Sequence, residues 1–351
     1  MIHQGDALSV LRTLPDESAQ MCVTSPPYWG LRDYGVPGQL GLEKTPAEYV
    51  AGMVAVFREV RRVLKPDGVL WLNLGDSYAA TSKGSGGKTN STLNAKRDAN
   101  GDLADDRKSQ PWMAQPRRFS LDDCGIKPKD LIGIPWRVAF ALQEAGWYLR
   151  CDIIWSKPNP MPESVTDRPT KAHEYIFLLS KSERYAYNAE AIKEPGIAVD
   201  RERRVTGRGG KEIGKGHSPQ RSNSGGFPNA ADKQRGHGRR HAGFNDRWDA
   251  MSLEEQTSVM RNKRSVWSIA TRPFSEAHFA TFPEEIPTVC ILAGSKPGDT
   301  VLDPFNGAGT VGVVCEKLQR RYIGIELSPS YVEMSRRRIR NVAPLFNQVS
   351  E

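Results

Sequence analysis

Two short stretches of the sequence combine residue types that could bind a planar group or a nucleoside. One is Ser25-Pro26-Pro27-Tyr28, and the other is Asp-Pro-Phe-Asn-Gly-Ala-Gly-Thr at residues 303–310. In the first stretch two prolines fix the backbone and remove two N–H donors, so a hydroxyl, carbonyl oxygens and an aromatic ring are held together. This arrangement suits a base that carries an exocyclic amine and is flipped out of a duplex. The alternative is a rigid proline turn with a packed tyrosine.

The segment at residues 303–310 lies between two different apolar patterns. The apolar run at 300–302 indicates a strand, and the apolar residues spaced along 311–318 indicate a helix. In parallel α/β sheets a nucleotide binds at such a junction, where glycines allow close approach and the helix N-terminus offers N–H groups. Residues 322–325 indicate the next strand, which ends on Glu326, where a carboxylate for ribose hydroxyls is expected.

The residues around the glycines decide which cofactor is expected. Residues 307–312 also fit the G-x-G-x-x-G pattern of dinucleotide sites, whereas Thr310 and Val311 exclude a Walker A loop. Asp303 disfavours a dinucleotide, because a carboxylate at the turn would repel a pyrophosphate. The same carboxylate suits a ligand that carries an ammonium and a sulfonium, so we predict S-adenosylmethionine as the cofactor.

The composition is that of a globular chain with enough apolar material for one large or two modest domains. It has 351 residues, of which 38% are hydrophobic and 26% charged, and a net charge of +8, which favours a polyanionic partner. No apolar stretch reaches the roughly eighteen residues of a membrane span, and no signal peptide is visible, so we expect a cytoplasmic protein without a membrane partner. The five cysteines have no C-x-x-C spacing, so we expect neither disulfides nor a metal site.

The two ends of the chain indicate a circular permutation. A strand stub at residues 1–3 leads into Gly5-Asp6 without a preceding element, and a helix at 331–339 ends the sequence where a third strand is due. We infer that residues 1–4 lie beside the strand that ends at Glu326. Asp6 would then end a strand at the carboxyl edge, where it could accept a hydrogen bond from the adenine amine, although a solvated turn aspartate is an equal alternative.

The middle of the chain keeps an α/β pattern between polar stretches. A helix is predicted at 49–64 and a strand at 69–73, separated by a turn. A second helix starts near Gly133, and strands at 147–155 and 174–179 would form an antiparallel hairpin at one edge of the sheet. The segment 81–123 is polar and predicted to be a long loop or insertion.

A second polar stretch, residues 200–247, carries most of the net charge. It holds twelve Lys and Arg residues and five Asp and Glu residues, a net charge of +7. Glycine interleaved with arginine and few apolar residues is typical of a segment that contacts phosphates, although a charge run is often only a solvated surface. The predicted DNA-binding residues are Arg201, Arg203, Arg204, Arg239 and Arg240.

The two motifs together resemble the signature of an enzyme family. Thr-Ser-Pro-Pro-Tyr at 24–28 and the segment 303–310 resemble the motifs of DNA amino-methyltransferases, which methylate adenine N6 or cytosine N4. The catalytic motif comes first and the cofactor motif last, an order that is similar to the β-class and matches the inferred permutation. The motifs stand about 275 residues apart and are more specific together than alone. The resemblance covers most of the chain outside the two polar insertions.

The resemblance implies roles for individual residues. Ser25 and the Pro26 carbonyl would hold the amine, Tyr28 would stack on the base, and Phe282 would line the methionine end of the cofactor. Trp155 would lie in a segment that lines the base pocket, where it either stacks on the base or belongs to the core. The predicted catalytic residues are Ser25, Pro26, Pro27 and Tyr28, and the predicted cofactor-binding residues are Asp6, Asp303, Phe305, Gly307, Gly309, Thr310, Glu326 and Phe282.

We therefore predict a site-specific DNA methyltransferase that transfers a methyl group from S-adenosylmethionine to an exocyclic base amine. Within the family, Ser25 in place of Asp favours cytosine N4, with adenine N6 as the alternative. Methylation of a cytosine ring carbon is disfavoured because none of the cysteines lies in a Pro-Cys loop. The same residues also allow an RNA or protein-amide methyltransferase and, from another class, a non-catalytic nucleic-acid-binding module. The intact Ser25, Tyr28, Asp303 and Glu326 disfavour the non-catalytic module.

The predicted fold class is α/β, a Rossmann-like S-adenosylmethionine-dependent methyltransferase fold that is circularly permuted, with a mostly parallel sheet and an antiparallel edge hairpin. Residues 1–195 would form the catalytic part, with the polar insertion at 81–123. Residues 196–262 would form a basic target-recognition insertion, and residues 263–351 the cofactor-binding part. The expected partner is double-stranded DNA, and the resemblance also allows a homodimer and a cognate restriction endonuclease.

Overall fold

The computed structural model describes residues 1–31, 33, 35–79, 125–195, 260–271 and 282–342. By its contacts the chain divides into two units, Met1–Ala191 with Arg264–Glu351, and Ile192–Lys263. In the second unit, β6 (Glu194–Pro195) pairs antiparallel with β7 (Met260–Arg261). The predicted target-recognition insertion at 196–262 falls in this unit, and its role stays a prediction. The polar insertion at 81–123 lies outside the described residues.

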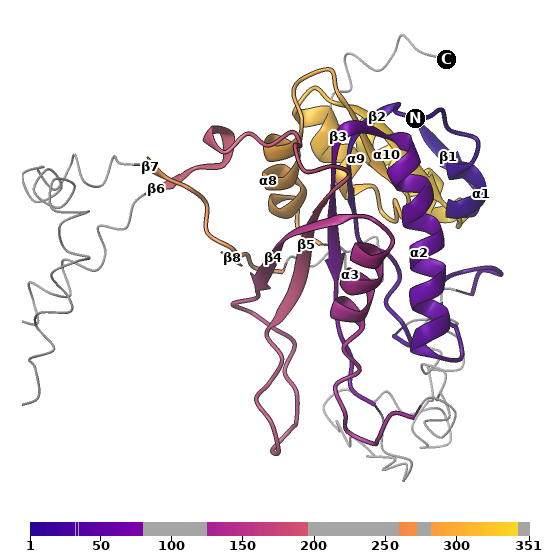
Figure 1. Ribbon diagram of the computed structural model, residues 1–351, viewed down its shortest axis with the longest axis vertical. Helices are drawn as coiled ribbons and strands as arrows, with labels where there is room; N and C mark the ends of the chain where they lie inside the picture. The colour runs from indigo at the N-terminus through magenta and orange to yellow at the C-terminus, as the bar shows by residue number, and fades with distance from the viewer. Residues whose placement is uncertain (32, 34, 80–124, 196–259, 272–281, 343–351) are drawn as a thin grey trace, which may run out of the picture. The chain divides into compact units, whose positions relative to one another are not determined.

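An eight-stranded sheet forms the centre of the first unit (Figure 1). In chain order its strands are β1 (Ile2–Gln4), β2 (Ala19–Thr24), β3 (Leu64–Leu74), β4 (Tyr148–Ser156), β5 (His173–Ser180), β8 (Val266–Ser268), β9 (Thr300–Asp303) and β10 (Arg321–Glu326). Their order across the sheet is β1-β10-β9-β2-β3-β5-β4-β8. The first five strands are parallel, and β5 runs antiparallel to both of its neighbours. The sheet is therefore mostly parallel with an antiparallel hairpin, as predicted.

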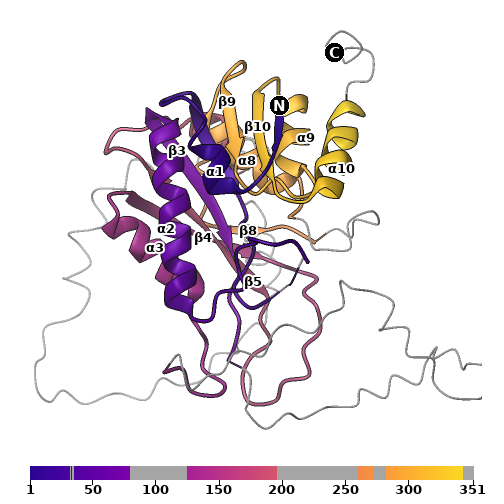
Figure 2. The same ribbon diagram turned by 90° about the vertical axis from the view of Figure 1, so that its right-hand side faces the viewer.

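Helices cover both faces of this sheet (Figure 2). One face carries α1 (Ala7–Leu11), α2 (Pro46–Val63) and α3 (Ile134–Glu144), and the other carries α8 (Glu285–Gly294), α9 (Thr310–Lys317) and α10 (Pro329–Arg340). Alternate residues of β3 serve the two faces: Leu70 and Leu72 join the apolar cluster around Phe57 of α2, whereas Val69 lies against Gly294 of α8. Burial on both faces explains the continuous apolar run of this strand.

The first strand of the chain pairs with its last strand, which confirms the inferred permutation. β1 runs parallel to β10, with Ile2 opposite Gly324 and Gln4 opposite Glu326. The α-amino group of Met1 donates to the Tyr322 carbonyl at 2.6 Å, and Gly5 N–H donates to the Glu326 carbonyl at 2.9 Å. The two ends of the sequence therefore build one edge of the sheet.

Two details of the sheet differ from the sequence-based expectation. The predicted turn after α2 is a bulge inside β3, because Leu64 already pairs with Ala19 before the ladder continues with Val69 opposite Met21. The hairpin of β4 and β5 is also not the outermost pair, since the three-residue β8 runs parallel to β4 beyond it. A strand this short carries too weak a period-2 pattern to be recognised in the sequence.

Among the described residues, no helix is long and apolar enough to cross a membrane.

Gly312 in α9 should be intolerant of a side chain. A Cβ at this position would lie 2.3 Å from Ile339 Cδ1 and 2.8 Å from Tyr322 Cε1. We expect Gly312→Ala to lower the free energy of unfolding by about 1–3 kcal/mol through overpacking, measured by urea denaturation. Gly52→Ala in α2 is the matched control, because its Cβ would come no closer than 3.3 Å to Leu40 Cδ2 and 4.0 Å to Glu43 Oε1. A Gly312→Ala protein as stable as the wild type would contradict the packing of α9 against α10 and β10.

Candidate active site

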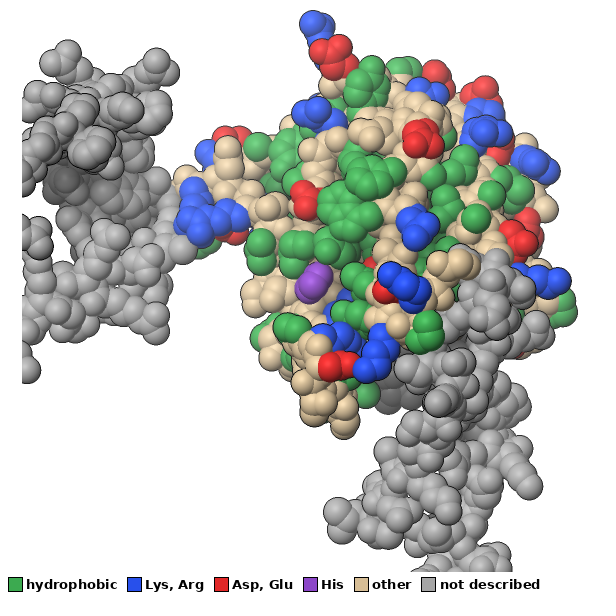
Figure 3. Space-filling view, turned by 60° about the horizontal axis from the view of Figure 1, so that its bottom comes forward, with side chains coloured by type: hydrophobic (Ala, Val, Ile, Leu, Met, Phe, Trp, Pro, Cys, Tyr) green, Lys and Arg blue, Asp and Glu red, His purple; other side chains and the backbone are tan. Residues whose placement is uncertain are grey.

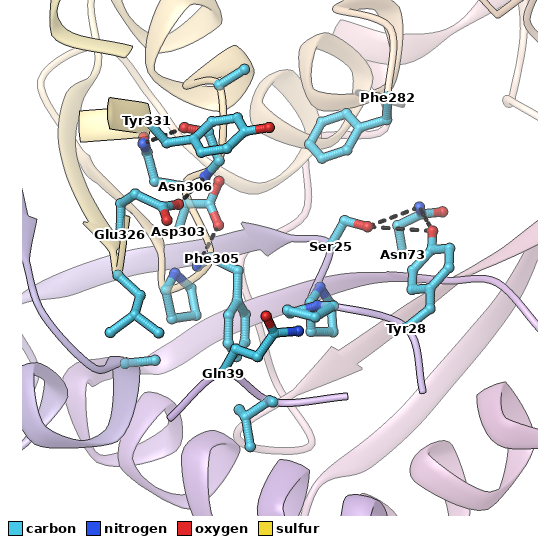
Figure 4. Close-up of a pocket in the computed structure, with 18 of the residues that line it drawn as sticks. Ser25, Tyr28, Gln39, Asn73, Phe282, Asp303, Phe305, Asn306, Glu326 and Tyr331 are labelled. Carbon is cyan, nitrogen blue, oxygen red and sulfur yellow. Dashed lines mark hydrogen bonds between the residues drawn. The ribbon is translucent and has the colours of Figure 1, made fainter. Parts of the chain in front are cut away.

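A cavity of about 430 Å³ lies in the first unit at the carboxyl ends of the parallel strands (Figure 4). Its walls come from the turns after β2, β9 and β10, together with residues near the ends of β3, β4 and β5. The carboxyl edge of a parallel sheet is where α/β proteins bind their ligands. The two motifs singled out in the sequence therefore meet in one cavity.

Asp303, the last residue of β9, is 2% exposed at the base of the cavity. Its Oδ1 accepts a hydrogen bond from Thr24 Oγ1 at 2.6 Å and from Phe305 N–H at 3.0 Å. Burial raises the pKa of this carboxyl to about 7, although both hydrogen bonds oppose the shift. Because a neighbouring cation favours the ionised form, this carboxyl is suited to a positively charged ligand group.

Glu326, the last residue of β10, points its carboxylate at the glycine turn after β9. Its Oε2 accepts from Gly307 N–H and its Oε1 from Ser328 N–H, both at 2.8 Å. Burial raises the pKa of this carboxyl, while the backbone N–H groups oppose the shift. Each carboxylate oxygen can accept a second hydrogen bond, so the group can receive two adjacent hydroxyls. Gly307 has φ of 49°, a backbone conformation that few other residues adopt.

The remaining residues of the glycine turn have different surroundings. Phe305 and Thr310 line the cavity, but Gly309 is not among its lining residues. Gly309 has φ of 78°, and a Cβ there would lie 2.6 Å from Ser335 Cβ. This glycine therefore allows α10 to pack closely on the start of α9, and the structure gives it no contact with the cavity.

Asp6 and Phe282, which are distant in sequence, also line the cavity. The Asp6 carboxylate accepts from Ser9 N–H at 2.8 Å and caps the N-terminus of α1. This bond leaves its other oxygen for a ligand. Figure 4 shows Phe282, Phe305 and Tyr331 arranged around the same space. Tyr331 was not singled out in the sequence, because it lies within the helical pattern of α10.

The Ser-Pro-Pro-Tyr turn after β2 forms the other side of the cavity. Ser25 Oγ donates to Tyr28 Oη at 3.3 Å, and Tyr28 Oη donates to Glu174 Oε2 at 2.6 Å. The Asn73 amide donates to Ser25 Oγ at 3.3 Å and to Tyr28 Oη at 2.8 Å. Burial, together with the Glu174 carboxylate, raises the pKa of the Tyr28 hydroxyl well above its usual range. The Ser25 hydroxyl proton is thus directed toward Tyr28, and one of its lone pairs stays available to a ligand.

Glu174 of β5 is the centre of this polar cluster. Its Oε2 also accepts from Asn73 Nδ2 at 3.0 Å, and its Oε1 pairs with Lys157 Nζ. The Lys157 ammonium in turn lies 4.4 Å from the ring centroid of Trp155. Trp155 is 3% exposed and its indole N–H donates to the Ile269 carbonyl, so it is a core tryptophan that also borders the cavity.

Sequence reasoning missed Asn73 and Glu174 as members of the site. It placed Lys157 only within the segment 154–157, which the family resemblance assigned to the base pocket. Asn73 carried a usable signal, because it is the one polar residue in the apolar run 69–74. A polar residue in a buried strand requires a partner, and a strand end is where a ligand site would supply one. Glu174 had no comparable signal, since charged residues beside a hairpin are common on protein surfaces.

Comparison with known proteins identifies the family. The family model for N6/N4 methyltransferases, described as DNA methylase, matches residues 19–337. The chain belongs to this family. It is 44% identical over 338 residues to the type II methyltransferase M.Cfr9I of Citrobacter freundii, covering 96% of this chain and 87% of the relative. It is also 43% identical to M.SmaI of Serratia marcescens, covering 95% and 89% of the two chains.

Solved structures share the fold of this DNA methylase. TTHA0409 of Thermus thermophilus, solved in complex with S-adenosyl-L-methionine, has a TM-score of 0.51 at 22% identity, covering 98% of this chain and 96% of that one. The cytosine-N4-specific PvuII DNA methyltransferase also has a TM-score of 0.51 at 22% identity, covering 99% and 87%. The comparisons confirm the predicted fold, and with the family model they confirm a DNA methyltransferase that uses S-adenosyl-L-methionine.

The predicted DNA-binding arginines lie outside the described residues, so their role stays a prediction. They are Arg201, Arg203, Arg204, Arg239 and Arg240. The other predicted site residues are placed by the structure, and all of them except Gly309 border the one cavity.

The geometry around Asp303 predicts a carboxyl group that titrates near neutral pH. Infrared difference spectra of the ligand-free protein should show a protonated carboxyl band that disappears as the pH rises through about 7. Asp303→Asn should lack this band. Thr24→Val removes a hydrogen bond that favours the carboxylate, so it should move the transition to higher pH. A Thr24→Val transition at the same pH as the wild type would contradict the assigned cause of the shift.

Proposed function

We propose that this DNA methylase methylates the exocyclic N4 amine of cytosine within a specific DNA sequence. The observation that supports this proposal is the Ser25 hydroxyl, which borders the cavity with its proton directed to Tyr28 and a lone pair available to a ligand. A hydroxyl in this position can accept one hydrogen of an amine. The amine and the cofactor would meet where the Ser-Pro-Pro-Tyr turn faces the glycine turn.

The cavity residues fit S-adenosyl-L-methionine. Buried Asp303 would receive its ammonium group, and Glu326, already oriented by Gly307 N–H, would accept from the ribose hydroxyls. The free oxygen of Asp6 would accept from the adenine amine. Bound S-adenosyl-L-methionine supplies a methyl group that is activated by the sulfonium. Phe305 and Phe282 would form apolar walls beside it, and Thr310 would border the start of α9.

The catalytic turn would hold the target base in one orientation. The amine hydrogens would be held by Ser25 Oγ and the Pro26 carbonyl, while the Tyr28 ring stacks on the base. Holding both hydrogens draws the nitrogen lone pair out of ring conjugation and makes it the nucleophile. Pro27 contributes by fixing the turn, because its carbonyl accepts from Tyr49 Oη at 2.9 Å. Glu174 and Asn73 fix the Tyr28 hydroxyl, so the ring is positioned before the base arrives.

Adenine N6 is the second candidate target. Both bases present an amine beside a ring nitrogen, so stacking on Tyr28 does not distinguish them. We favour cytosine because the residue before the two prolines is a neutral serine, which can accept from the amine and donate to a neighbour, whereas a carboxylate only accepts. The carboxylate of this polar cluster belongs to Glu174, which accepts a hydrogen bond from Tyr28 Oη. It does not take the place of the residue before the two prolines.

The basic segment 200–247 is proposed as the part that contacts the DNA backbone. Its twelve Lys and Arg residues give it a net charge of +7, and phosphate contacts by such residues supply affinity without sequence information. Because the family consists of DNA methylases, an RNA substrate, a protein-amide substrate and a non-catalytic role are disfavoured. A cognate restriction endonuclease is a proposed partner, by analogy with type II methyltransferases such as M.Cfr9I. A homodimer stays a prediction from the family resemblance.

Affinity for S-adenosyl-L-methionine should depend on pH through Asp303. Below its pKa of about 7 the carboxyl must lose a proton before it can pair with the ammonium group. Affinity should therefore fall by up to about tenfold per pH unit below neutrality. Asp303→Asn should weaken binding by about 1.5–3 kcal/mol at pH 8 and remove this dependence. Calorimetry that finds the same pH dependence in Asp303→Asn would rule out Asp303 as the ammonium ligand.

Nucleoside mass spectrometry of methylated DNA tests the base and the mechanism together. We expect N4-methylcytosine, and N6-methyladenine alone would reject the cytosine proposal while leaving amino-methylation in place. Ser25→Ala should slow the methylation step by about 10- to 1,000-fold, as for loss of one positioned polar contact to the reacting group. Its affinity for S-adenosyl-L-methionine should be unchanged. Full activity of Ser25→Ala would reject the proposed role of the hydroxyl.

A further inference from the structure

The large apolar side chain of Met161 is exposed to solvent next to the cavity. Met161 is 85% exposed, the highest value among the large apolar residues that the structure describes, yet it borders the cavity that holds Ser25 and Tyr28. It lies in the connection between β4 and β5, residues 157–172, which extends beyond the strand ends in Figure 1. Figure 3 shows this end of the molecule, where apolar side chains lie next to Lys and Arg side chains.

The loop around Met161 is held in place on both sides. Before it, Asn159 exchanges two hydrogen bonds with the backbone of Thr271, at 2.9 and 3.0 Å. After it, Glu163 accepts from Arg168 Nη1 at 2.8 Å and from Lys171 N–H at 3.3 Å. The Arg168 guanidinium also lies 3.8 Å from the ring centroid of Tyr78.

The backbone next to Met161 is also stiff. Proline stands at positions 158, 160 and 162, so every second residue of this stretch has a fixed φ. Lys157 N–H donates to the Ala172 carbonyl at 2.8 Å and closes the base of the loop. The loop therefore presents Met161 outward in a defined position, and the side chain does not fold back onto the protein.

A single exposed apolar residue is common on protein surfaces and by itself signifies little. The position of Met161 distinguishes it from other exposed apolar residues, because in the proposed function the target base leaves its stack at the mouth of this cavity. Unstacking a base costs a few kcal/mol, and proteins that distort DNA insert apolar side chains, including Met, between base steps. We propose that Met161 enters the base stack of the substrate duplex and fills the space that the target base vacates. This inference rests on the proposed function, in which the flipped base enters the cavity beside Ser25.

The test compares two duplexes that carry the recognition sequence. That sequence is first identified by sequencing methylated plasmid DNA. One duplex is fully paired, and the other has an abasic site opposite the target base, which removes most of the cost of flipping. Single-turnover methylation by the full-length enzyme is measured with saturating S-adenosyl-L-methionine. We expect Met161→Ala to be roughly tenfold slower than wild type on the paired duplex but within about twofold of it on the abasic duplex.

Matched variants separate insertion into the base stack from a general loss of activity. Met161→Leu restores apolar volume and should recover most of the loss, whereas Leu131→Ala removes a 52% exposed apolar side chain that does not border the cavity and should match wild type on both duplexes. An equal loss on both duplexes in Met161→Ala, or no loss on the paired one, would overturn the inference. Full activity of Ser25→Ala would instead contradict the proposed function, so the two failures are distinguishable.

Discussion

The hydrogen bond from Thr24 to Asp303 is the interaction on which the site depends. It is 2.6 Å long, it is buried, and it joins residues 279 positions apart in the sequence. Thr24 ends β2 and immediately precedes Ser25, and Asp303 ends β9 and immediately precedes the glycine turn. Because β2 and β9 are neighbours in the sheet, the turn that would hold the base and the turn that would hold the cofactor start from one contact.

Because the chain order is permuted, the remaining residues of the proposed cofactor side of the cavity come from segments near the two ends of the chain. β1 pairs with β10, and the Arg336 guanidinium of α10 donates to the Ile2 carbonyl at 3.0 Å. Asp6 and Glu326, which are distant in sequence, consequently face one cavity. On the opposite side, Glu174 links Tyr28 and Asn73 to the hairpin of β4 and β5. The charged groups of the cavity are thus separated, with the carboxyls of Asp303 and Glu326 on the proposed cofactor side and the Lys157–Glu174 pair on the proposed base side.

Sequence patterns predicted the parts of this protein that depend on local chemistry. The strand–turn–helix around Gly307 and the permutation follow from apolar periodicity and from an unfinished sheet at both ends, and the structure contains both. Asp303 could be predicted as a cofactor residue because its charge argues against a pyrophosphate. The structure places it in the cavity, and its contact with the cofactor stays a prediction. The helix start near Gly133 followed from a proline that fits only in a first turn.

The features that sequence patterns missed depend on contacts between distant segments. The hydrogen bonds of Glu174 to Tyr28 and Asn73 depend on the register of β5 against β3, which no single strand encodes. Gly309 fits a cofactor pattern, but its lack of a side chain is required by Ser335 of α10, which follows it by 26 positions. The bulge in β3 depends likewise on its pairing with β2.

A crystal structure of the full-length enzyme with S-adenosylhomocysteine and its duplex substrate tests the central claim most directly. The account predicts that the ligand ammonium lies against Asp303, that its ribose hydroxyls lie against Glu326, and that its sulfur faces the Ser25 hydroxyl across the target amine. A ligand bound outside this cavity, or a target base that enters without contacting the Ser-Pro-Pro-Tyr turn, would contradict the claim that the Thr24–Asp303 contact joins two halves of one active site.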